Sequence, residues 1–413
     1  MLDHFEQTDH CVVLNVKSTM VWCYKCDDSV SSASVDALRK YLNSLFEAPK
    51  RKSTISVVSG TRGIINIGNT CFLAASMQAL SHTPLFQETM RSSSVYSDTQ
   101  LAEPLTGKQR LVIAVRNFLL AQWEPNPQSG QPIDPDEILT SVQRLNALFQ
   151  GYHQHDSQEL LRFVLSTMHE ELRPKKDEES IVSRIFGGKT CSTVTCLKCN
   201  KESTCIEPFF DLSLPIPAEP FSPEMTERIL GSFSCESIKS ESTSMSSWLW
   251  SKTKSALGLV PESKVSLSDC LVQFMRTEKL TGVNAYLCEH CKVKTDCLKR
   301  MSIRALPEVL VIHLKRFRHD WGSSKLSKVV TIPLEDDLDV SAFVDSPTGG
   351  AKYRLCSFVQ HVGSIGSGHY VAYGKHKVNK QWFLFDDSRV SLLTSISDQT
   401  EAYVLFFQRV QPS

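Results

Sequence analysis

The chain has 413 residues, of which 22% are charged and 41% hydrophobic, and its 45 basic and 45 acidic residues cancel. This composition is typical of a globular protein with a large core and excludes a mainly disordered chain. The zero net charge gives no global electrostatic reason to expect nucleic acid as a partner, and no run approaches the roughly 20 apolar residues that cross a bilayer.

Fourteen cysteines occur in a chain whose first seven residues lack the basic and apolar regions of a signal peptide. In a protein that is not exported, metal binding and catalysis are better uses for thiols than a disulfide framework. The sequence therefore predicts an intracellular location, cytoplasmic with the nucleus as a second candidate, and no membrane insertion.

The first 30 residues hold four candidate zinc ligands around a strand-like run, Val12–Val16. The ligands are His4, His10, Cys23 and Cys26. They could form one Cys2His2 site, or each pair could be half of a site whose other ligands are missing. Residues 34–47 have helical spacing of apolar residues, and the basic, turn-rich residues 48–60 predict a linker.

From residue 61 to about 410 the pattern is that of one long folded unit. Residues 72–80 have helical composition, and Asp156 with Glu159 resembles a capping box that opens a second helix. The second half is rich in predicted strands, at 309–315, 370–373, 382–385 and 402–407. The serine-rich residues 218–262 read as an insertion, with residues 248–250 (Trp-Leu-Trp) as a candidate docking point.

Cys71 directly precedes the first of these helices. A helix N-terminus favours the thiolate, which is the nucleophilic form of cysteine, and Asn69 or Thr70 could cap this helix. The side-chain amide of Asn66 and the backbone N–H of Cys71 are candidate donors to an oxyanion. A buried structural cysteine is the commoner alternative for a lone thiol.

His369 lies beside glycines that would let a substrate tail pass close to the backbone, and a strand-like run follows it. Asp386 could orient the imidazole and stabilise its charged form, as the third member of a catalytic triad does. A structural histidine and an Asp-Asp turn are the alternatives. The three residues together predict a nucleophilic cysteine site.

Two CxxC pairs supply the ligand set of a structural zinc site. They are Cys196 with Cys199 and Cys288 with Cys291. A redox role for a CxxC pair is the alternative, but two pairs with polar turn residues favour zinc. We expect the nearby Cys191, Cys205, Cys297 and His290 to take no part.

These motifs together resemble the ubiquitin-specific proteases, a family of cysteine deubiquitinases. Residues 63–72 are similar to the family's Cys box, and residues 354–407 are similar to its His box. Two blocks between them, at 154–160 and 306–317, also match. The resemblance covers residues 61–410 and rests on several independent motifs, so an accidental match is not expected.

The resemblance implies an α+β fold, with a papain-like cysteine protease core arranged as fingers, palm and thumb, and a zinc-ribbon fingers subdomain. The implied catalytic residues are Cys71 as nucleophile, His369 as general base, Asp386 as orienting acid, Asn66 as oxyanion donor and Asp387 in an assisting role. The implied contacts to the ubiquitin tail are made by Asp156, Gly368 and Tyr370. The implied cofactor is structural zinc, with no catalytic metal.

Two positions depart from the family pattern. Ala74 replaces an asparagine and His155 replaces a glutamine, and neither belongs to the triad. The runs at 209–215 and 312–319 look closest to the von Hippel–Lindau-interacting deubiquitinases. Residues 1–47 resemble the C-terminal part of a ubiquitin-binding zinc finger, whose other cysteines would precede Met1, so we expect this module to be truncated.

The expected activity is thiol-dependent hydrolysis of the isopeptide bond between the C-terminal glycine of ubiquitin and a substrate lysine. The expected partners are ubiquitin and ubiquitinated proteins, and neither nucleic acid nor a membrane. A non-catalytic ubiquitin-binding scaffold and another type of Cys-His-Asp enzyme, such as an acyltransferase or transglutaminase, are the alternatives.

Overall fold

The computed structural model describes residues 58–92, 104–123, 130–151, 153–175, 178–231, 264–318, 324–345, 351–364, 368–396 and 402–411, with the backbone of three short N-terminal strands. The chain divides into two compact units. Unit 1 comprises Met1–His82, Gln87–Glu171 and His369–Leu393; unit 2 comprises Thr83–Phe86, Leu172–Gly368 and Thr394–Ser413.

The N-terminal strands form a small antiparallel sheet in the order β1-β2-β3. Their bounds are Val13–Asn15, Met20–Cys23 and Asp28–Ser29. The predicted strand at 12–16 is thus confirmed, in a slightly shorter form. The predicted helix at 34–47, residues 48–57 of the linker and the side chains of the four N-terminal zinc ligands lie outside the described residues.

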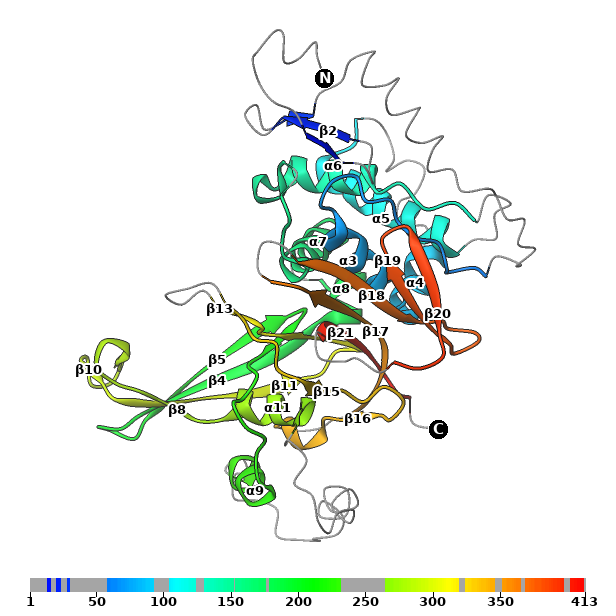
Figure 1. Cartoon of the computed structure of the whole chain (residues 1–413). Helices are drawn as coiled ribbons and strands as arrows, with labels where there is room; N and C mark the ends of the chain where they lie inside the picture. Colours follow the sequence, from blue (N-terminus) through cyan, green and yellow to red (C-terminus); the bar gives the residue numbers. More distant parts are fainter. Residues whose placement is uncertain are drawn as a thin grey trace, which may run out of the picture. The chain divides into compact units, whose positions relative to one another are not determined.

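Unit 1 is built around helix α3, which packs against strand β18 on one side and helix α7 on another (Figure 1). Its helices are α3 (Cys71–Ser81), α4 (Pro84–Ser92, whose first three residues belong to unit 2), α5 (Gly107–Trp123), α6 (Asp136–Leu145), the 3-10 turn η1 (Ala147–Phe149) and α7 (Ser157–Glu171). Every residue of α3 is buried, and its polar side chains, such as Ser76 and Gln78, are hydrogen-bonded to backbone carbonyls. The first residue of α3 therefore has a fixed position in the core of unit 1.

Helix α7 begins where the capping signal predicts. Asp156 precedes it, and its Oδ1 accepts hydrogen bonds from the backbone N–H groups of Gln158 (2.7 Å) and Glu159 (3.4 Å). These bonds satisfy amides that have no partner within the helix. The apolar residues that face the core from this helix are buried, namely Leu160, Leu161, Val164, Leu165 and Met168.

Three antiparallel strands complete unit 1: β18 (His369–Lys375), β19 (Trp382–Asp386) and β20 (Arg389–Leu393). Ala372 of β18 faces Phe385 of β19. The start of β18 and the end of β19 therefore meet at one edge, and this edge carries the histidine and the two aspartates of the predicted site.

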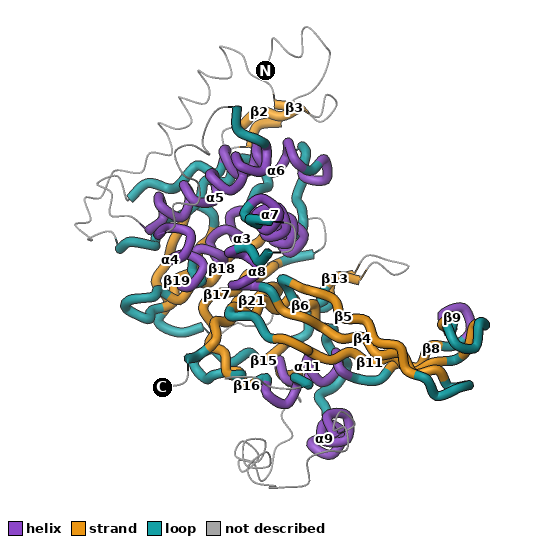
Figure 2. Tube along the Cα trace, turned by 180° about the vertical axis from the view of Figure 1, so that it is seen from behind, coloured by secondary structure: helices purple, strands orange, loops and turns teal. Residues whose placement is uncertain are grey.

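Unit 2 contains a long antiparallel ribbon in the order β5-β4-β11-β8 (Figure 2). The strands are β4 (Gly188–Cys196), β5 (Glu202–Phe209), β8 (Glu278–Leu280) and β11 (Cys297–Ala305). Near one end of the ribbon lie the 3-10 turn η2 (Gly282–Asn284) and the hairpin of β9 (Tyr286–Leu287) and β10 (Lys294–Thr295). We call residues 196–201 and 282–295 the fingertip.

A second sheet in unit 2 runs in the order β16-β17-β21-β12-β6, with β12 parallel to β6 and the other pairs antiparallel. Its strands are β6 (Leu212–Leu214), β12 (Val309–Leu314), β16 (Leu338–Asp339), β17 (Lys352–Val362) and β21 (Ala402–Arg409). The two inner strands, β12 and β21, are almost wholly buried, as near-continuous apolar runs predict. The predicted strands at 309–315, 370–373, 382–385 and 402–407 are thus all confirmed.

The remaining elements of unit 2 are short. They are the helices α8 (Ile181–Phe186), α9 (Pro223–Gly231) and α11 (Leu267–Met275), the 3-10 turn η3 (Ser341–Phe343), and the strands β7 (Val265–Ser266), β13 (Phe317–Arg318), β14 (Ser324–Lys325) and β15 (Val330–Thr331). Helix α9 lies within the predicted insertion at 218–262, whose tryptophan pair falls outside the described residues. None of the helices within the described ranges combines the length and the apolar character needed to span a membrane.

Candidate active site

Cys71 is the first residue of α3, in the place that the sequence predicts. Thr70 occupies the N-cap, and its backbone carbonyl accepts from the N–H groups of Leu73 (3.0 Å) and Ala74 (2.9 Å). Its hydroxyl does not cap the helix, because it accepts from the N–H of Ile67 instead (3.1 Å). The thiol is only 2% exposed, and it lies where backbone N–H groups and the helix dipole favour negative charge.

The loop before Cys71 is organised by the side chain of Asn66. Its Oδ1 accepts hydrogen bonds from the N–H groups of Gly68 (3.0 Å) and Thr70 (3.1 Å). Both bonds lock the short loop onto the start of α3. The other end of the same amide is therefore held in a fixed orientation near Cys71.

His369 and Asp386 form the second part of the site. Nε2 of His369 lies 2.7 Å from Oδ1 of Asp386, which leaves Nδ1 as the nitrogen for Cys71. The pKa of His369 is raised to about 9. Its hydrogen bond with Cys71 makes the largest contribution and its hydrogen bond with Asp386 a smaller one, while burial acts in the opposite direction. The imidazole therefore favours its charged form, as it would beside a thiolate.

Asp387 takes a different position from Asp386. Its Oδ2 is 4.0 Å from Nε2 of His369 but accepts a 2.9 Å hydrogen bond from Nδ2 of Asn66. The backbone carbonyl of Asp387 also accepts from the N–H of Ile64 (2.8 Å). Asp387 thus joins the segment before Cys71 to the hairpin of β19 and β20.

Gly63 makes this junction sterically feasible. A Cβ added at Gly63 would lie 2.4 Å from the backbone oxygen of Ser388, so no side chain fits between the two segments. The glycine at the start of the Cys box is therefore explained by the close approach of two backbones.

The predicted tail-binding residues have distinct environments. Asp156 caps α7. Tyr370 is 4% exposed, burial raises the pKa of its phenol, and its side chain is hydrogen-bonded to Ser157. Gly368 has no room for a side chain, since an added Cβ would lie 2.1 Å from Nε2 of His361. Asp156 and Tyr370 therefore lie together in unit 1, with Tyr370 as a buried support.

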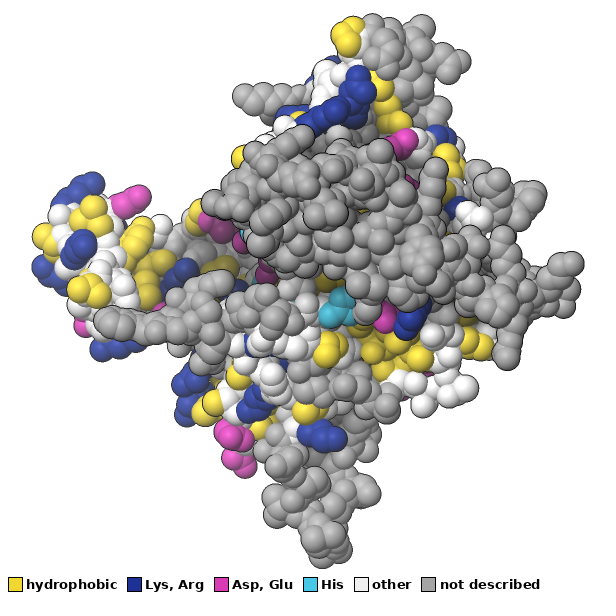
Figure 3. Space-filling model, turned by 45° about the horizontal axis from the view of Figure 1, so that its top comes forward, with side chains coloured by type: hydrophobic (Ala, Val, Ile, Leu, Met, Phe, Trp, Pro, Cys, Tyr) yellow, Lys and Arg dark blue, Asp and Glu magenta, His cyan; other side chains and the backbone are white. Residues whose placement is uncertain are grey.

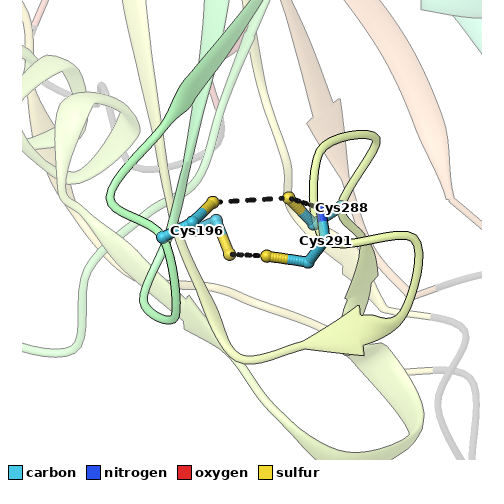
Figure 4. A group of neighbouring side chains, drawn as sticks. Cys196, Cys288 and Cys291 are labelled. Atoms are coloured by element: carbon cyan, nitrogen blue, oxygen red, sulfur yellow. Dashed lines mark hydrogen bonds between the residues drawn. The ribbon is translucent and has the colours of Figure 1, made fainter.

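The four predicted zinc ligands come together at the fingertip (Figure 4). Their sulfur atoms all lie within 4.8 Å of one another, with 4.0 Å between Cys196 and Cys291 and 3.7 Å between Cys199 and Cys288. A tetrahedral ion with Zn–S bonds of about 2.3 Å requires sulfur atoms about 3.8 Å apart. The cluster therefore fits a structural zinc ion.

Local geometry and electrostatics support this ligand set. The N–H groups of Asn200 and Lys292 bond back to the carbonyls of Cys196 and Cys288, which closes each CxxC pair into a knuckle. The hydroxyl of Thr295 lies 3.1 Å from the sulfur of Cys196 and is the largest of the contributions that lower the pKa of that thiol to about 6. Hydrogen bonds with the neighbouring thiols, that with Cys199 first, raise the pKa of Cys291 to about 12, so Cys196 ionises before Cys291. A thiolate is the form that binds zinc. The expected bystanders (Cys191, Cys205, Cys297 and His290) stand outside the cluster.

The fingertip also carries exposed apolar side chains. Figure 3 shows hydrophobic and basic side chains gathered at this end of the ribbon. The exposed large hydrophobic residues of the fingertip are Leu197, Val283, Leu287 and Val293. Because they are exposed, these side chains do not form the core of the zinc-bearing subdomain. That subdomain therefore has a small core of its own, in which the zinc ligands and Cys297 are central.

Comparison with known proteins decides the family. Residues 62–407 match the family described as "Ubiquitin carboxyl-terminal hydrolase". The chain belongs to this family. A nucleophilic cysteine accounts for the chemistry of its members without a catalytic metal, so zinc has a structural role.

Two curated relatives illustrate the similarity. Ubiquitin carboxyl-terminal hydrolase 2 of Gallus gallus is 30% identical over 396 residues, which cover 89% of this chain and 98% of the relative. The enzyme of the same name from Bos taurus is 30% identical over 383 residues, covering 86% of this chain. The chain spans only 56% of the length of the bovine relative.

A solved structure shows the same fold. The SAGA Ubp8/Sgf11/Sus1/Sgf73 DUB module bound to ubiquitin aldehyde matches with a TM-score of 0.64 and 24% identity, covering 100% of this chain and 84% of that chain. The predicted α+β fold of this hydrolase family, with its papain-like core and zinc-ribbon fingers, is confirmed.

The N-terminal residues have a separate match. Residues 1–35 match the family described as "Zn-finger in ubiquitin-hydrolases and other protein". This range includes His4, His10, Cys23 and Cys26. The match is to the type of module that the sequence resembles, while the ligand arrangement stays a prediction.

Sequence reasoning missed one residue at the site of this hydrolase. The amide Nε2 of Gln154 lies 3.2 Å from Sγ of Cys71. Gln154 stands two residues before Asp156 in a block that matches the family, but nothing in its own type or spacing distinguishes it from a surface glutamine. Of the two departures from the family pattern, Ala74 is buried in α3, and the ring of His155 packs against Phe72.

Proposed function

We propose that the chain is a thiol-dependent deubiquitinase. It hydrolyses the isopeptide bond between the C-terminal glycine of ubiquitin and a substrate lysine. The observation that carries the proposal is the chain of contacts from Cys71 through His369 to Asp386, within residues that match the hydrolase family. This arrangement holds a thiol beside a base whose other nitrogen is fixed by a carboxylate.

In the first step the thiolate of Cys71 adds to the carbonyl carbon of the ubiquitin glycine. A C–S bond forms and the carbonyl π electrons move to oxygen. The imidazolium of His369 then gives its proton to the lysine nitrogen as the C–N bond breaks, which leaves a thioester. In the second step His369 takes a proton from water and the resulting hydroxide adds to the thioester carbon. The C–S bond then breaks, which restores the thiolate of Cys71 and releases ubiquitin with a free C-terminal carboxylate.

The oxyanion of each step needs hydrogen-bond donors. We assign this role to the amide of Asn66 and the backbone N–H of Cys71. Asp387 orients Asn66 through the 2.9 Å bond to Nδ2. Donors that are fixed before the reaction stabilise the developing charge without reorganisation.

The tail of ubiquitin is the proposed substrate segment. Asp156 is assigned to its basic residues, with Gly368 and Tyr370 lining the approach to Cys71. Because Tyr370 is buried, its contribution is to hold Asp156 and Ser157 in place. A Gly-Gly end suits this approach, because larger side chains would not pass.

We propose the following domain organisation. Residues 1–47 belong to a zinc finger of the ubiquitin-binding type, with His4, His10, Cys23 and Cys26 as candidate ligands, residues 48–60 are a linker, and residues 61–410 are the catalytic domain with an insertion at 218–262. The matches at 1–35 and 62–407 support this division. None of the ten cysteines among the described residues forms a disulfide bond, which supports an intracellular location.

Within the family, the sequence runs at 209–215 and 312–319 favour the von Hippel–Lindau-interacting subgroup. This finer assignment rests on those runs alone. Ubiquitinated proteins are the proposed substrates, and the zero net charge gives no reason to add nucleic acid.

A direct test uses ubiquitin joined to a fluorescent peptide through a lysine side chain. Wild-type protein should release the peptide, and Cys71→Ser should not. A wild-type protein that binds ubiquitin but releases nothing would establish the non-catalytic scaffold instead. Transfer of ubiquitin to an added amine in preference to water would indicate the acyltransferase alternative.

A further inference from the structure

Gln154 lies in the loop before α7, and its side chain reaches the nucleophile. Its Nε2 is 3.2 Å from Sγ of Cys71, a distance at which an amide N–H donates to a thiolate. We propose that Gln154 is a further catalytic residue, which donates first to the thiolate and then to the oxyanion that forms beside it. This inference rests on the proposed function.

The residues that follow Gln154 are fixed to the helix of the nucleophile. The ring of His155 packs edge-on against Phe72 at 5.2 Å and against Phe149 at 5.3 Å. The backbone carbonyl of Ser157 accepts from the hydroxyl of Ser76 in α3 (3.1 Å). Gln154 is therefore held relative to Cys71 by contacts from its own neighbours, as a preorganised donor requires.

Asn66, the assigned side-chain donor to the oxyanion, cannot use both of its amide hydrogens for that role. One hydrogen of Asn66 Nδ2 is directed to Asp387, so that amide has a single remaining hydrogen for the oxyanion. The amide nitrogen of Gln154 faces the sulfur that attacks the carbonyl carbon, and the oxyanion forms on that same carbon. Gln154 therefore complements Asn66 from another segment of the chain.

The chemical role involves no proton transfer by Gln154. As the C–S bond forms, the negative charge moves from sulfur to the former carbonyl oxygen, and the amide N–H follows it. His369 remains the group that gives and takes protons. The amide stabilises charge at both positions, so its loss should lower the rate of the chemical step more than the affinity for ubiquitin.

The test compares Gln154→Leu with Gln150→Leu, a matched control because Gln150 lies in the same loop and is exposed. The first readout is hydrolysis of ubiquitin-aminomethylcoumarin. Gln154→Leu should lower kcat about tenfold to hundredfold, with KM within about twofold of wild type, and Gln150→Leu should match wild type. Unchanged kcat, or a raised KM with kcat unchanged, would overturn the proposal.

The second readout does not depend on ubiquitin. The rate at which iodoacetamide alkylates Cys71 is measured against pH, since only the thiolate reacts. The midpoint of this profile should lie higher in Gln154→Leu than in Gln150→Leu, and equal midpoints in the two variants would contradict the proposal. Should wild type fail to cleave ubiquitin substrates, the proposed function falls while this profile still decides the role of Gln154.

A third variant guards against a folding defect in Gln154→Leu. Gln154→Glu keeps the shape of the side chain but places a carboxylate near the sulfur. It should lower both kcat and the alkylation rate more than Gln154→Leu, because like charges repel. Equal or faster alkylation in Gln154→Glu would contradict donation by the amide.

Discussion

Asp386 and Asp387 are adjacent in sequence, yet the structure assigns them separate tasks that a pH profile can distinguish. Oδ1 of Asp386 is 2.7 Å from Nε2 of His369, whereas Oδ2 of Asp387 is 4.0 Å from that nitrogen and bonds Asn66 instead. Asp386→Asn should therefore change the titration of His369. Asp387→Ala should change the orientation of Asn66.

The size of the first effect follows from the geometry. A hydrogen bond to a charged group contributes about 1.5–3 kcal/mol. Because the side chains of His369 and Asp386 are 41% and 45% exposed, water screens the pair and the lower end of this range applies. About 1.4 kcal/mol corresponds to one pKa unit, so Asp386→Asn should lower the pKa of His369 from about 9 to about 8.

The assay is the pH dependence of kcat/KM with a ubiquitin substrate. The charged form of His369 is present below its pKa and is lost as the pH rises through that pKa. The activity of wild type should therefore fall on the alkaline side near pH 9, and the activity of Asp386→Asn should fall about one pH unit lower. Asp387→Ala should reduce kcat about tenfold to hundredfold and move this alkaline limb less than Asp386→Asn does, because Asp387 acts on the pKa of His369 through its charge alone. Equal shifts in both variants, or a larger shift in Asp387→Ala, would refute this division of roles.

Two further predictions concern stability. The Cys288→Ala variant should lose the fingertip zinc and melt at a lower temperature than wild type. The control is Cys205→Ala, because Cys205 is exposed and lies outside the cluster; this variant should keep the zinc and the wild-type melting temperature. Full zinc content in Cys288→Ala, measured by atomic absorption, would contradict the ligand set. Gly63→Ala should destabilise the protein by about 1–3 kcal/mol in denaturant unfolding, because its Cβ would lie 2.4 Å from the oxygen of Ser388. Gly231→Ala is the control, since nothing lies within 4 Å of the added atom, and equal stability of the two variants would refute the steric argument.

Local patterns in the sequence predicted most of the elements that position the site. The capping signal at Asp156 placed the start of α7, and the helical composition of the residues after Cys71 placed α3. The zinc ligands were also predictable, because CxxC pairs have few other uses in a reducing environment. These features depend on neighbouring residues, so the sequence reports them directly.

Features that depend on distant contacts were not predictable in this way. The bond between Asn66 and Asp387 joins residues 321 positions apart, and it separates the task of Asp387 from that of Asp386. The contact of Gln154 with Cys71 spans 83 positions. Helix α9 lies in a stretch that composition alone marks as an insertion, and none of its residues is buried.

The central claim is that Cys71 is a nucleophile that acts on the C-terminus of ubiquitin. The most direct test is incubation of the folded protein with ubiquitin–vinyl sulfone, followed by mass spectrometry of the adduct, with Cys71→Ser as control. We predict one adduct per chain, on Cys71, and none in the control. An unlabelled Cys71 in folded wild-type protein, or labelling that persists in Cys71→Ser, would contradict the account.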